Sequence, residues 1–531
     1  MQSTNQKANH LQGIIGIFLY SCCTPERVVN ALARMGISIS MNAILSAIKS
    51  LSNEAAHSLR TLGQTLLASY AYDNVDVNLK TSMPVSENPF ESLKHLTSGL
   101  LLPLEHGVTR DDLRCSAELW AKSPFNPDNE ESLPDNKTYR NLMGIYPEPP
   151  GSSLTQRERF IKFLLLRDLC THSAPYFQQF LDYLDAPEEI EPVPIVKTVI
   201  QPMFSMEANN STTSGNLQAL DRLLEQGGIY DPDVLDEESY NLEIDVSEYV
   251  VLFHGDLATG IRIRTAQEYR SIEEKPYHRK QHAVFVPGLF HVKMAAVDAL
   301  HRILVKPELA RKDKTGLMGD IMVLRPKETG IMASKPGFRR MHQVISHAGI
   351  SRRLDCWRVL AERKNSAHTT LDKLAESQPM FHELEDMAED IIREFASTED
   401  LSLHRLKPVS ERDQLLENAQ LINYYLALYE ELSYAMNVGD IGRVERCLFT
   451  WIPLFKATGK HIYATYLERF FLDLHFKYPQ GLRRAIRYNI LINPTGKAGK
   501  FRAADWLVEL HNLDIKVSSS TKCVLITHVL D

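Results

Sequence analysis

The sequence predicts a mixed α/β protein with a sheet-containing core and a large helical part. Three observations support this class. Short runs rich in Val, Leu, Tyr and Phe at about 66–77, 249–254 and 283–286 are typical of buried strands. Apolar residues at helical spacing fill 1–65 and most of 301–480. The composition, 44% hydrophobic and 24% charged, is that of an ordinary globular chain.

The overall composition limits the class of protein. A chain of 531 residues is expected to form about two to four compact units. The formal net charge of −8 argues against a generally basic nucleic-acid binder, so any such surface must be a local patch. The 7 cysteines include no C-x-x-C pair, which suits a reducing compartment, the nucleus or the cytoplasm. The apolar segment 13–20 is too short to cross a membrane, and we expect a soluble intracellular protein.

Residues 1–65 are predicted to be helical. Gly36 separates two amphipathic stretches, and Ser38 or Ser40 can cap the second. Two helices joined by a glycine-containing turn are the form of a helix-turn-helix that binds DNA. A plain helical hairpin is the favoured alternative, because the second helix offers few polar side chains that could read bases.

The following residues are predicted as one core that is interrupted twice. Residues 66–300 hold its first part, and about 81–247 are interpreted as a loop-rich insertion between strands, with acidic loops and a helix at about 155–183. Residues 301–480 are predicted to form a helical insertion domain, because apolar stripes at helical spacing follow one another there.

Residues 481–531 are predicted to return to the core. They indicate a strand at 486–492, a glycine-lysine loop at 493–500 and a helix at about 502–514. After Lys516 the sequence lacks the pattern of an element that closes a domain, and we expect a truncated core there.

Three acidic residues have a setting that suits metal binding. Asp73 and Asp256 each follow an apolar strand, and Glu509 lies on a predicted helix. In an α/β sheet, ligands gather at the carboxyl ends of strands, and carboxylates are the oxygen ligands that Mg²⁺ prefers. The hypothesis is a catalytic site for Mg²⁺ or Mn²⁺ that cleaves a phosphodiester. The alternative is coincidence, since the chain has 67 acidic residues.

Histidines and basic residues add further candidates. His254 and His291 lie beside the predicted strands and are candidates to support the metal site, although hydrogen-bonded structural histidines are the commoner outcome. Lys497, Lys500 and Arg502 could contact DNA phosphates without reading sequence, although an ordinary solvated loop would look the same. The loop is not a P-loop, because the G-x-x-x-x-G-K-[ST] spacing is absent.

Five segments together resemble a large fungal family of unknown function. They read YDNVD at 72–76, HGDLAT at 254–259, GLFH at 288–291, KPGFRRMH at 335–342 and NPTGKAGKFRAADW at 493–506. The layout of that family is similar to transposase-derived proteins of the DDE type, which have an RNase H-like core and a helical insertion before the last acidic residue.

The resemblance assigns roles to individual residues. It implies that Asp73, Asp256 and Glu509 are the three catalytic, metal-binding carboxylates and that Asn512, one turn beyond Glu509, supports them. Asp76, within the first of the five segments, is expected to support them as well. The partner implied is DNA.

The chain departs from the family pattern at two places. Relatives commonly read G-D-Q-L-T where Leu257 and Ala258 follow Asp256, and they read G-D-F-H where Leu289 stands here. We therefore expect a transposase-derived, DDE-type nuclease or strand transferase that acts on DNA, or a degenerate copy of one. The alternatives are a non-catalytic DNA- or chromatin-binding protein on the same scaffold and a structural or interaction protein.

Overall fold

The computed structural model describes residues 9–78, 93–129, 137–149, 151, 153–233, 245–396 and 399–520. Part of the predicted insertion lies outside the described residues, as do residues 521–531, which are most of the stretch after Lys516 where a truncated core was expected. The chain divides into two compact units. Unit 1 comprises 1–136, 194–291 and 473–531, and unit 2 comprises 137–193 and 292–472. The predicted mixed α/β class is confirmed, because unit 1 contains a sheet and many helices.

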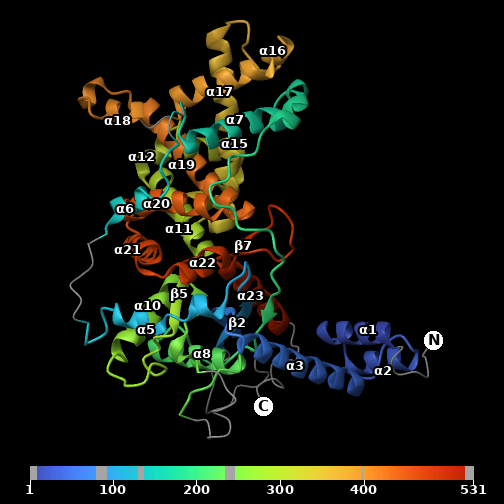
Figure 1. Ribbon diagram of the computed structural model, residues 1–531. Coiled ribbons are helices and arrows are strands. Elements are labelled where there is room, and N and C mark those ends of the chain that lie inside the picture. Colours follow the sequence, from blue (N-terminus) through green and yellow to red (C-terminus); the bar gives the residue numbers. More distant parts are fainter. Residues whose placement is uncertain are drawn as a thin grey trace. The chain divides into compact units, whose positions relative to one another are not determined.

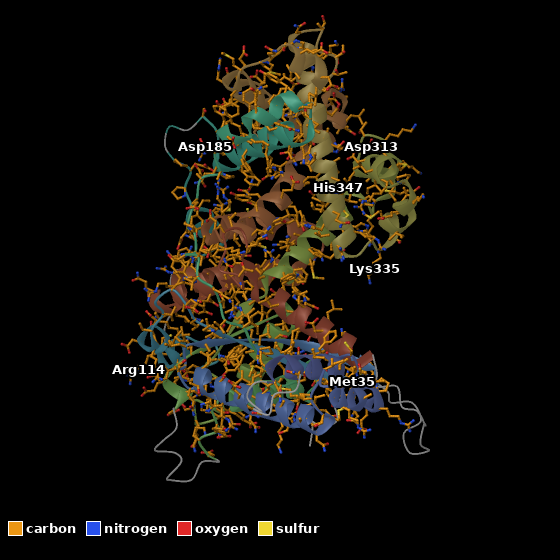
Figure 2. The ribbon with its side chains drawn as sticks, turned by 90° about the vertical axis from the view of Figure 1, so that its right-hand side faces the viewer. Met35, Arg114, Asp185, Asp313, Lys335 and His347 are labelled. Atoms are coloured by element: carbon orange, nitrogen blue, oxygen red, sulfur yellow. The ribbon has the colours of Figure 1, made fainter. Side chains whose placement is uncertain are left out.

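Unit 1 begins with three helices, as the sequence predicted. They are α1 (His10–Ser21), α2 (Glu26–Arg34) and α3 (Met41–Gly63). Of the two predicted capping serines, Ser40 caps α3, since its hydroxyl accepts a hydrogen bond from the Ala43 amide at 3.3 Å. Gly36 adopts a positive φ of 74° in the turn between α2 and α3. Met35, labelled in Figure 2, is 70% exposed at that turn.

A five-stranded sheet forms the centre of unit 1 (Figure 1). Its strand order is β3-β2-β1-β4-β5. Strands β1, β2 and β3 pair antiparallel, whereas β1, β4 and β5 run parallel to one another. The strands are β1 (Ala68–Asn78), β2 (Leu93–Pro103), β3 (Gln201–Pro202), β4 (Val251–Gly255) and β5 (Ala283–Pro287).

Helices cover both faces of this sheet. Because side chains alternate along a strand, Tyr70 and Tyr72 point to one face and Ala71 to the other. The tyrosine face packs against α3, α8 (Thr213–Gln226) and α10 (Leu257–Tyr269). The Ala71 face packs against α23 (Ala504–Ser520) through Ala504 and Val508. The sheet is therefore the middle of three layers.

Two sequence predictions differ from the structure in unit 1. Residues 81–247, expected as an insertion between strands, contribute β2, β3 and α8 to the sheet layers, while only 137–193 of that stretch belong to unit 2. The physical reason is that β2 is buried on both faces from residue 96 to 102, so it lacks the alternation by which a half-buried strand is recognised.

The second difference concerns the strand predicted at 486–492. Only β6 (Leu491–Ile492) is a strand, paired with β7 (Arg502–Ala503), and the residues before it form α22 (Gln480–Asn489). Leu482, Ala485 and Ile486 are buried at helical spacing, so packing of one helix face decides the structure of this short apolar run. The predicted helix at 502–514 is present as α23.

The remaining elements of unit 1 are short. They are α4 (Arg110–Leu113), α5 (Ser116–Ala121), the 3₁₀ turn η3 (Val246–Glu248) and the π-helical turn η6 (Asp473–Lys477).

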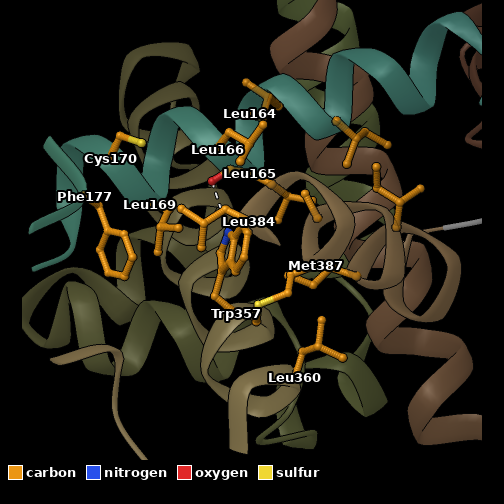
Figure 3. Close-up of a cluster of buried hydrophobic side chains, with 14 of the residues drawn as sticks. Leu164, Leu165, Leu166, Leu169, Cys170, Phe177, Trp357, Leu360, Leu384 and Met387 are labelled. Carbon is orange, nitrogen blue, oxygen red and sulfur yellow. Dashed lines mark hydrogen bonds between the residues drawn. The ribbon is translucent and has the colours of Figure 1, made fainter. Parts of the chain in front are cut away.

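Unit 2 is helical in the part of the chain that the structure describes. Its core joins α7 (Gln156–His172), α15 (Phe338–Lys364) and α17 (Phe381–Phe395), as Figure 3 shows. The Trp357 indole lies fully buried at its centre and donates a hydrogen bond to the Leu165 carbonyl oxygen at 3.1 Å. The other elements are α6 (Tyr139–Met143), η2 (Pro175–Tyr183), α11 (Leu289–Leu304), which starts in unit 1, α12 (Glu308–Lys312), α13 (Leu317–Leu324), η4 (Pro326–Glu328), α14 (Thr329–Ser334), α16 (Leu371–Glu376), α18 (Glu399–Arg405), η5 (Val409–Glu411), α19 (Gln414–Val438), α20 (Ile441–Ala457) and α21 (His461–Leu472).

A buried ion-pair network holds α7, α19 and α20 of unit 2 together. Arg443 is 1% exposed and its guanidinium lies 2.9 Å from the Glu431 carboxylate. Arg157 reaches the same carboxylate at 3.2 Å. Glu431 is thus buried between two cations, which offsets the cost of removing its charge from water.

Candidate metal centre

Asp73 lies on β1, and Asp256 directly follows the neighbouring strand β4. In the parallel pairing of β1 with β4, Ala71 is opposite His254, and continuing this register by two residues brings Asp73 beside Asp256. Both residues belong to the sheet face that α23 covers, by the alternation of side chains along each strand. The Asp256 carboxylate also caps α10, because it accepts a hydrogen bond from the Thr259 backbone amide at 2.6 Å.

Glu509 reaches the same face of the sheet from α23. This helix is held to the sheet by Asn512, which is 2% exposed. The Asn512 amide donates to the Asn74 carbonyl oxygen at 3.2 Å and accepts a hydrogen bond from the Ser98 hydroxyl. Because Asn512 lies one turn beyond Glu509, these bonds to β1 and β2 set where Glu509 stands.

Three potential ligand groups converge at this point. One ligand atom each from Asp73, His291 and Glu509 all lie within 4.8 Å of one another. The His291 Nε2 atom is 3.5 Å from the Glu509 carboxylate. Asp256 is close enough that its charge raises the pKa of both Asp73 and His291. The structure thus brings together Asp73, Glu509 and one of the two histidines that the sequence singled out, while Asp256 lies near this group without belonging to it.

Asp505 completes the arrangement and was not found in the sequence. It lies in the first turn of α23, 3% exposed, and accepts the Phe290 amide at 3.1 Å and the His291 amide at 2.9 Å. These amides belong to the N-terminus of α11, where a carboxylate is stabilised by the helix dipole. Asp505 also accepts from His291 Nδ1 at 2.9 Å. An acidic residue at the start of a helix was its only signal in the sequence.

Burial and the concentrated negative charge shift the pKa of two groups. Burial, reinforced by the charges of Asp256 and Glu509, raises the pKa of Asp73 to about 6, against the lowering effects of the Asn74 amide and of His291. Burial lowers the pKa of His291, but the hydrogen bond and charge of Asp505, with Asp73 and Asp256, outweigh it and raise that pKa to about 9. The site therefore favours a positive charge among its carboxylates.

Two predicted supporting residues, His254 and Asp76, are not among the three groups that converge. His254 is 1% exposed on β4, and its Nε2 atom has no hydrogen-bond partner among the described residues. Burial lowers the pKa of its imidazole to about 4, with the charge of Asp505 opposing this. Asp76 is three residues beyond Asp73 and therefore points to the opposite face of the sheet, where it pairs with His95 at 2.7 Å. The expectation that Asp76 supports the site is not met by this geometry.

The predicted basic loop precedes α23 directly. Its turn is built around the buried Asn493, whose side-chain oxygen accepts the Gly496 amide at 2.9 Å. Lys497 and Lys500 are exposed on the loop. The Arg502 guanidinium stacks on the Trp506 ring, 5.6 Å from its centre. The three cations thus stand just before the helix that carries Asp505 and Glu509.

A second group of acidic residues with a histidine lies on the surface of unit 1. Ligand atoms of Asp231, Asp233 and His278 also fall within 4.8 Å of one another. Lys275 pairs with Asp233 there. This cation already compensates part of the negative charge, and Asp233 is exposed, whereas Asp73, His291 and Glu509 are all partly buried.

Comparison with known proteins identifies a family. None of the described helices is long and apolar enough to cross a membrane. No curated protein and no solved structure matches the chain. A family model, DUF6589, described as a family of unknown function, matches residues 139–523, a stretch that includes Asp256, His291, Asp505 and Glu509. Because the match covers well over half of the chain, the protein belongs to this family of unknown function.

Proposed function

We propose that this protein is a metal-dependent, phosphodiester-cleaving enzyme of the DDE transposase type that acts on DNA. The observation that carries the proposal is the convergence of Asp73 and Glu509, from a strand and a helix more than 400 residues apart in sequence, beside Asp256. Convergence of these residues is what the resemblance to DDE proteins implies.

The sheet supports the proposal. We interpret it as an RNase H-like core: three antiparallel strands are followed by two strands parallel to the first, with order β3-β2-β1-β4-β5. Asp73 lies on the central strand, Asp256 follows the strand next to it, and the helix on this face supplies Glu509. Unit 2 would then be mainly the helical insertion before the last acidic residue.

The donor set fits Mg²⁺ or Mn²⁺. Asp73, Asp256 and Glu509 offer carboxylate oxygens, which are the ligands that these hard cations prefer, and their mutual repulsion is relieved by a bound dication. When bound, the metal would activate the attacking water or 3′-hydroxyl and stabilise the leaving oxygen. The protein's own part is to hold the three carboxylates in place through the sheet register and the Asn512 anchor.

The basic loop is proposed to hold the DNA backbone. Lys497, Lys500 and Arg502 are positive groups that precede α23, and phosphate contacts of this kind position a duplex without reading its sequence. Because the whole chain carries a net charge of −8, binding must depend on this local patch and should weaken steeply with salt.

Nicking of plasmid DNA tests the function. We expect supercoiled DNA to be nicked in the presence of Mg²⁺ or Mn²⁺ and to stay intact with EDTA. The substitution Asp256→Asn should abolish nicking while α10 keeps its cap, since Asn caps helices as well as Asp. Asp245→Asn is the matched control, because Asp245 likewise caps a helical turn, through the Ser247 amide at 2.8 Å, outside the cluster. Equal nicking by the wild type and the Asp256 variant would reject the role of Asp256.

A second candidate function is DNA binding without cleavage on the same scaffold. It is favoured by Leu289, which is 3% exposed and offers no oxygen where relatives commonly carry an acid. This candidate predicts salt-sensitive retention of DNA with no metal-dependent nicking. Substituting Lys497 and Lys500 by Ala should then reduce the slope of log affinity against log salt by about 0.9 for each lost contact to a duplex.

A further inference from the structure

We propose that His291 is a nitrogen ligand of the metal in this site, that Asp505 is the residue that positions it, and that the metal is a transition-metal dication such as Mn²⁺ in preference to Mg²⁺. The inference rests on the proposed metal site and goes beyond its three carboxylates by naming the fourth ligand, its support and the class of metal.

The two nitrogens of the His291 ring have different partners. Nδ1 lies 2.9 Å from the Asp505 carboxylate, which leaves Nε2 to face the group formed with Asp73 and Glu509. Histidines that bind metals usually donate the other ring N–H to a carboxylate, which sets the tautomer and the orientation of the ring. The arrangement around His291 has this form.

Asp505 is itself rigidly held. It is 3% exposed, and its carboxylate accepts hydrogen bonds from two backbone amides at the N-terminus of α11 in addition to the one from the imidazole. A Cβ atom at Gly288 would lie 2.3 Å from its Oδ2 atom, so the carboxylate fills the space beside the turn. The imidazole is therefore oriented before any ligand arrives, which lowers the ordering cost of binding.

An ion pair between protonated His291 and the nearby carboxylates would compensate less of their negative charge than a bound metal ion would. One imidazole cannot neutralise the four carboxylates of Asp73, Asp256, Asp505 and Glu509, and a dication supplies the missing positive charge.

The ligand types decide the class of metal. Mg²⁺ binds oxygen ligands almost exclusively and keeps several waters. Imidazole is a better ligand for first-row transition metals, and Mn²⁺, the weakest binder of that series, suits carboxylate oxygens as Mg²⁺ does but also accepts a nitrogen ligand. A site of two or three carboxylates and one imidazole nitrogen should therefore bind Mn²⁺ more tightly than Mg²⁺. The metal preference thus depends on His291, while the carboxylates serve both ions.

Mn²⁺ titration of the full-length protein tests this inference. Calorimetry with MnCl₂ and MgCl₂ should show Mn²⁺ binding about tenfold or more tighter than Mg²⁺. His291→Gln should remove that preference by weakening Mn²⁺ alone, and Asp505→Asn should weaken Mn²⁺ by about 10- to 100-fold. His95→Gln is the matched control, because His95 forms a similar imidazole–carboxylate pair, with Asp76, outside the cluster; it should bind Mn²⁺ as the wild type does.

A spectroscopic measurement keeps the test independent of how the variants fold. Electron spin echo spectra of Mn²⁺ bound to the wild type should show nitrogen coupling from one coordinated imidazole. Mn²⁺ binding that is lost in Asp73→Asn and Glu509→Gln but shows no nitrogen coupling and is unchanged in His291→Gln would overturn this inference and leave the carboxylate site intact. A wild type that binds neither ion would overturn the proposed metal site as well.

Discussion

Replacing His282 by Phe should make β5 of unit 1 less sensitive to acid. His282 is fully buried, and neither ring nitrogen has a hydrogen-bond partner among the described residues. Its ring stacks on Tyr277 with the centroids 5.4 Å apart, a contact that Phe can keep. Burial, with a smaller effect of the charge on Lys280, lowers the pKa of His282 from 6.5 to about 3.

The direction in which stability changes with pH follows from proton linkage. The unfolded chain, with a pKa of about 6.5, binds a proton well before the folded chain does, so the stabilising contribution is complete above pH 6.5 and is lost as the pH falls below it. Between pH 7 and pH 5 the loss is about 2 kcal/mol, from 1.36 kcal/mol per pKa unit. The size of this loss depends mainly on the pKa of His282 in the unfolded chain, because its pKa in the folded chain lies far below pH 5.

Hydrogen exchange measures this loss locally. Amides of β5 should lose about 2 kcal/mol more protection between pH 7 and pH 5 in the wild type than in His282→Phe, after correction for intrinsic exchange rates. Each protein is compared with itself at pH 7, so any packing cost of the substitution cancels. Equal losses in the two proteins would show that the His282 ring is not held neutral in the interior, and the reasoning would fail.

Three further substitutions have defined outcomes. Gly288→Ala places a methyl group 2.3 Å from Asp505 Oδ2 and should lower the stability of unit 1 by about 1–3 kcal/mol and weaken Mn²⁺ binding, as denaturation and calorimetry would measure. Arg443→Met removes one of the two cations around the buried Glu431 and should cost about 3–5 kcal/mol in urea unfolding of unit 2, part of which the double variant with Glu431→Gln recovers. Trp357→Phe deletes the hydrogen bond to the Leu165 carbonyl oxygen and leaves a void, and a thermal melt should show a loss of about 1–3 kcal/mol.

The parts of the fold that sequence could predict are those with strong local patterns. The runs at β1, β4 and β5 are apolar, rich in strand-forming residues and bounded by polar residues, so their positions were predicted to within a few residues. Asp73 and Asp256 could be selected because each follows such a run. Their meeting depends on parallel pairing of β1 with β4, which no local pattern encodes.

The parts that sequence could not predict depend on tertiary packing. Strand β2 has polar Thr97 and Ser98 buried in its centre, and these are tolerated only because distant partners satisfy them: the Ala208 carbonyl oxygen accepts from Thr97, and Asn512 from Ser98. Asp505 looked like an ordinary acidic residue in a first helical turn. Its contacts to Phe290 and His291 cross more than 200 residues of sequence and become visible only in three dimensions.

The division of unit 1 into three separated stretches of chain has a consequence for biosynthesis. β1 leaves the ribosome early, but α23, which covers its face and carries Glu509, is made roughly 20–90 s later at about 5–20 residues per second. From the time β5 is made until α23 follows, the Ala71 face of the sheet lacks its covering helix, while unit 2 can already collapse. A nascent or prematurely terminated chain therefore has a bare apolar sheet that chaperones can recognise. The group of Asp73, His291 and Glu509 can assemble only after α23 has been translated.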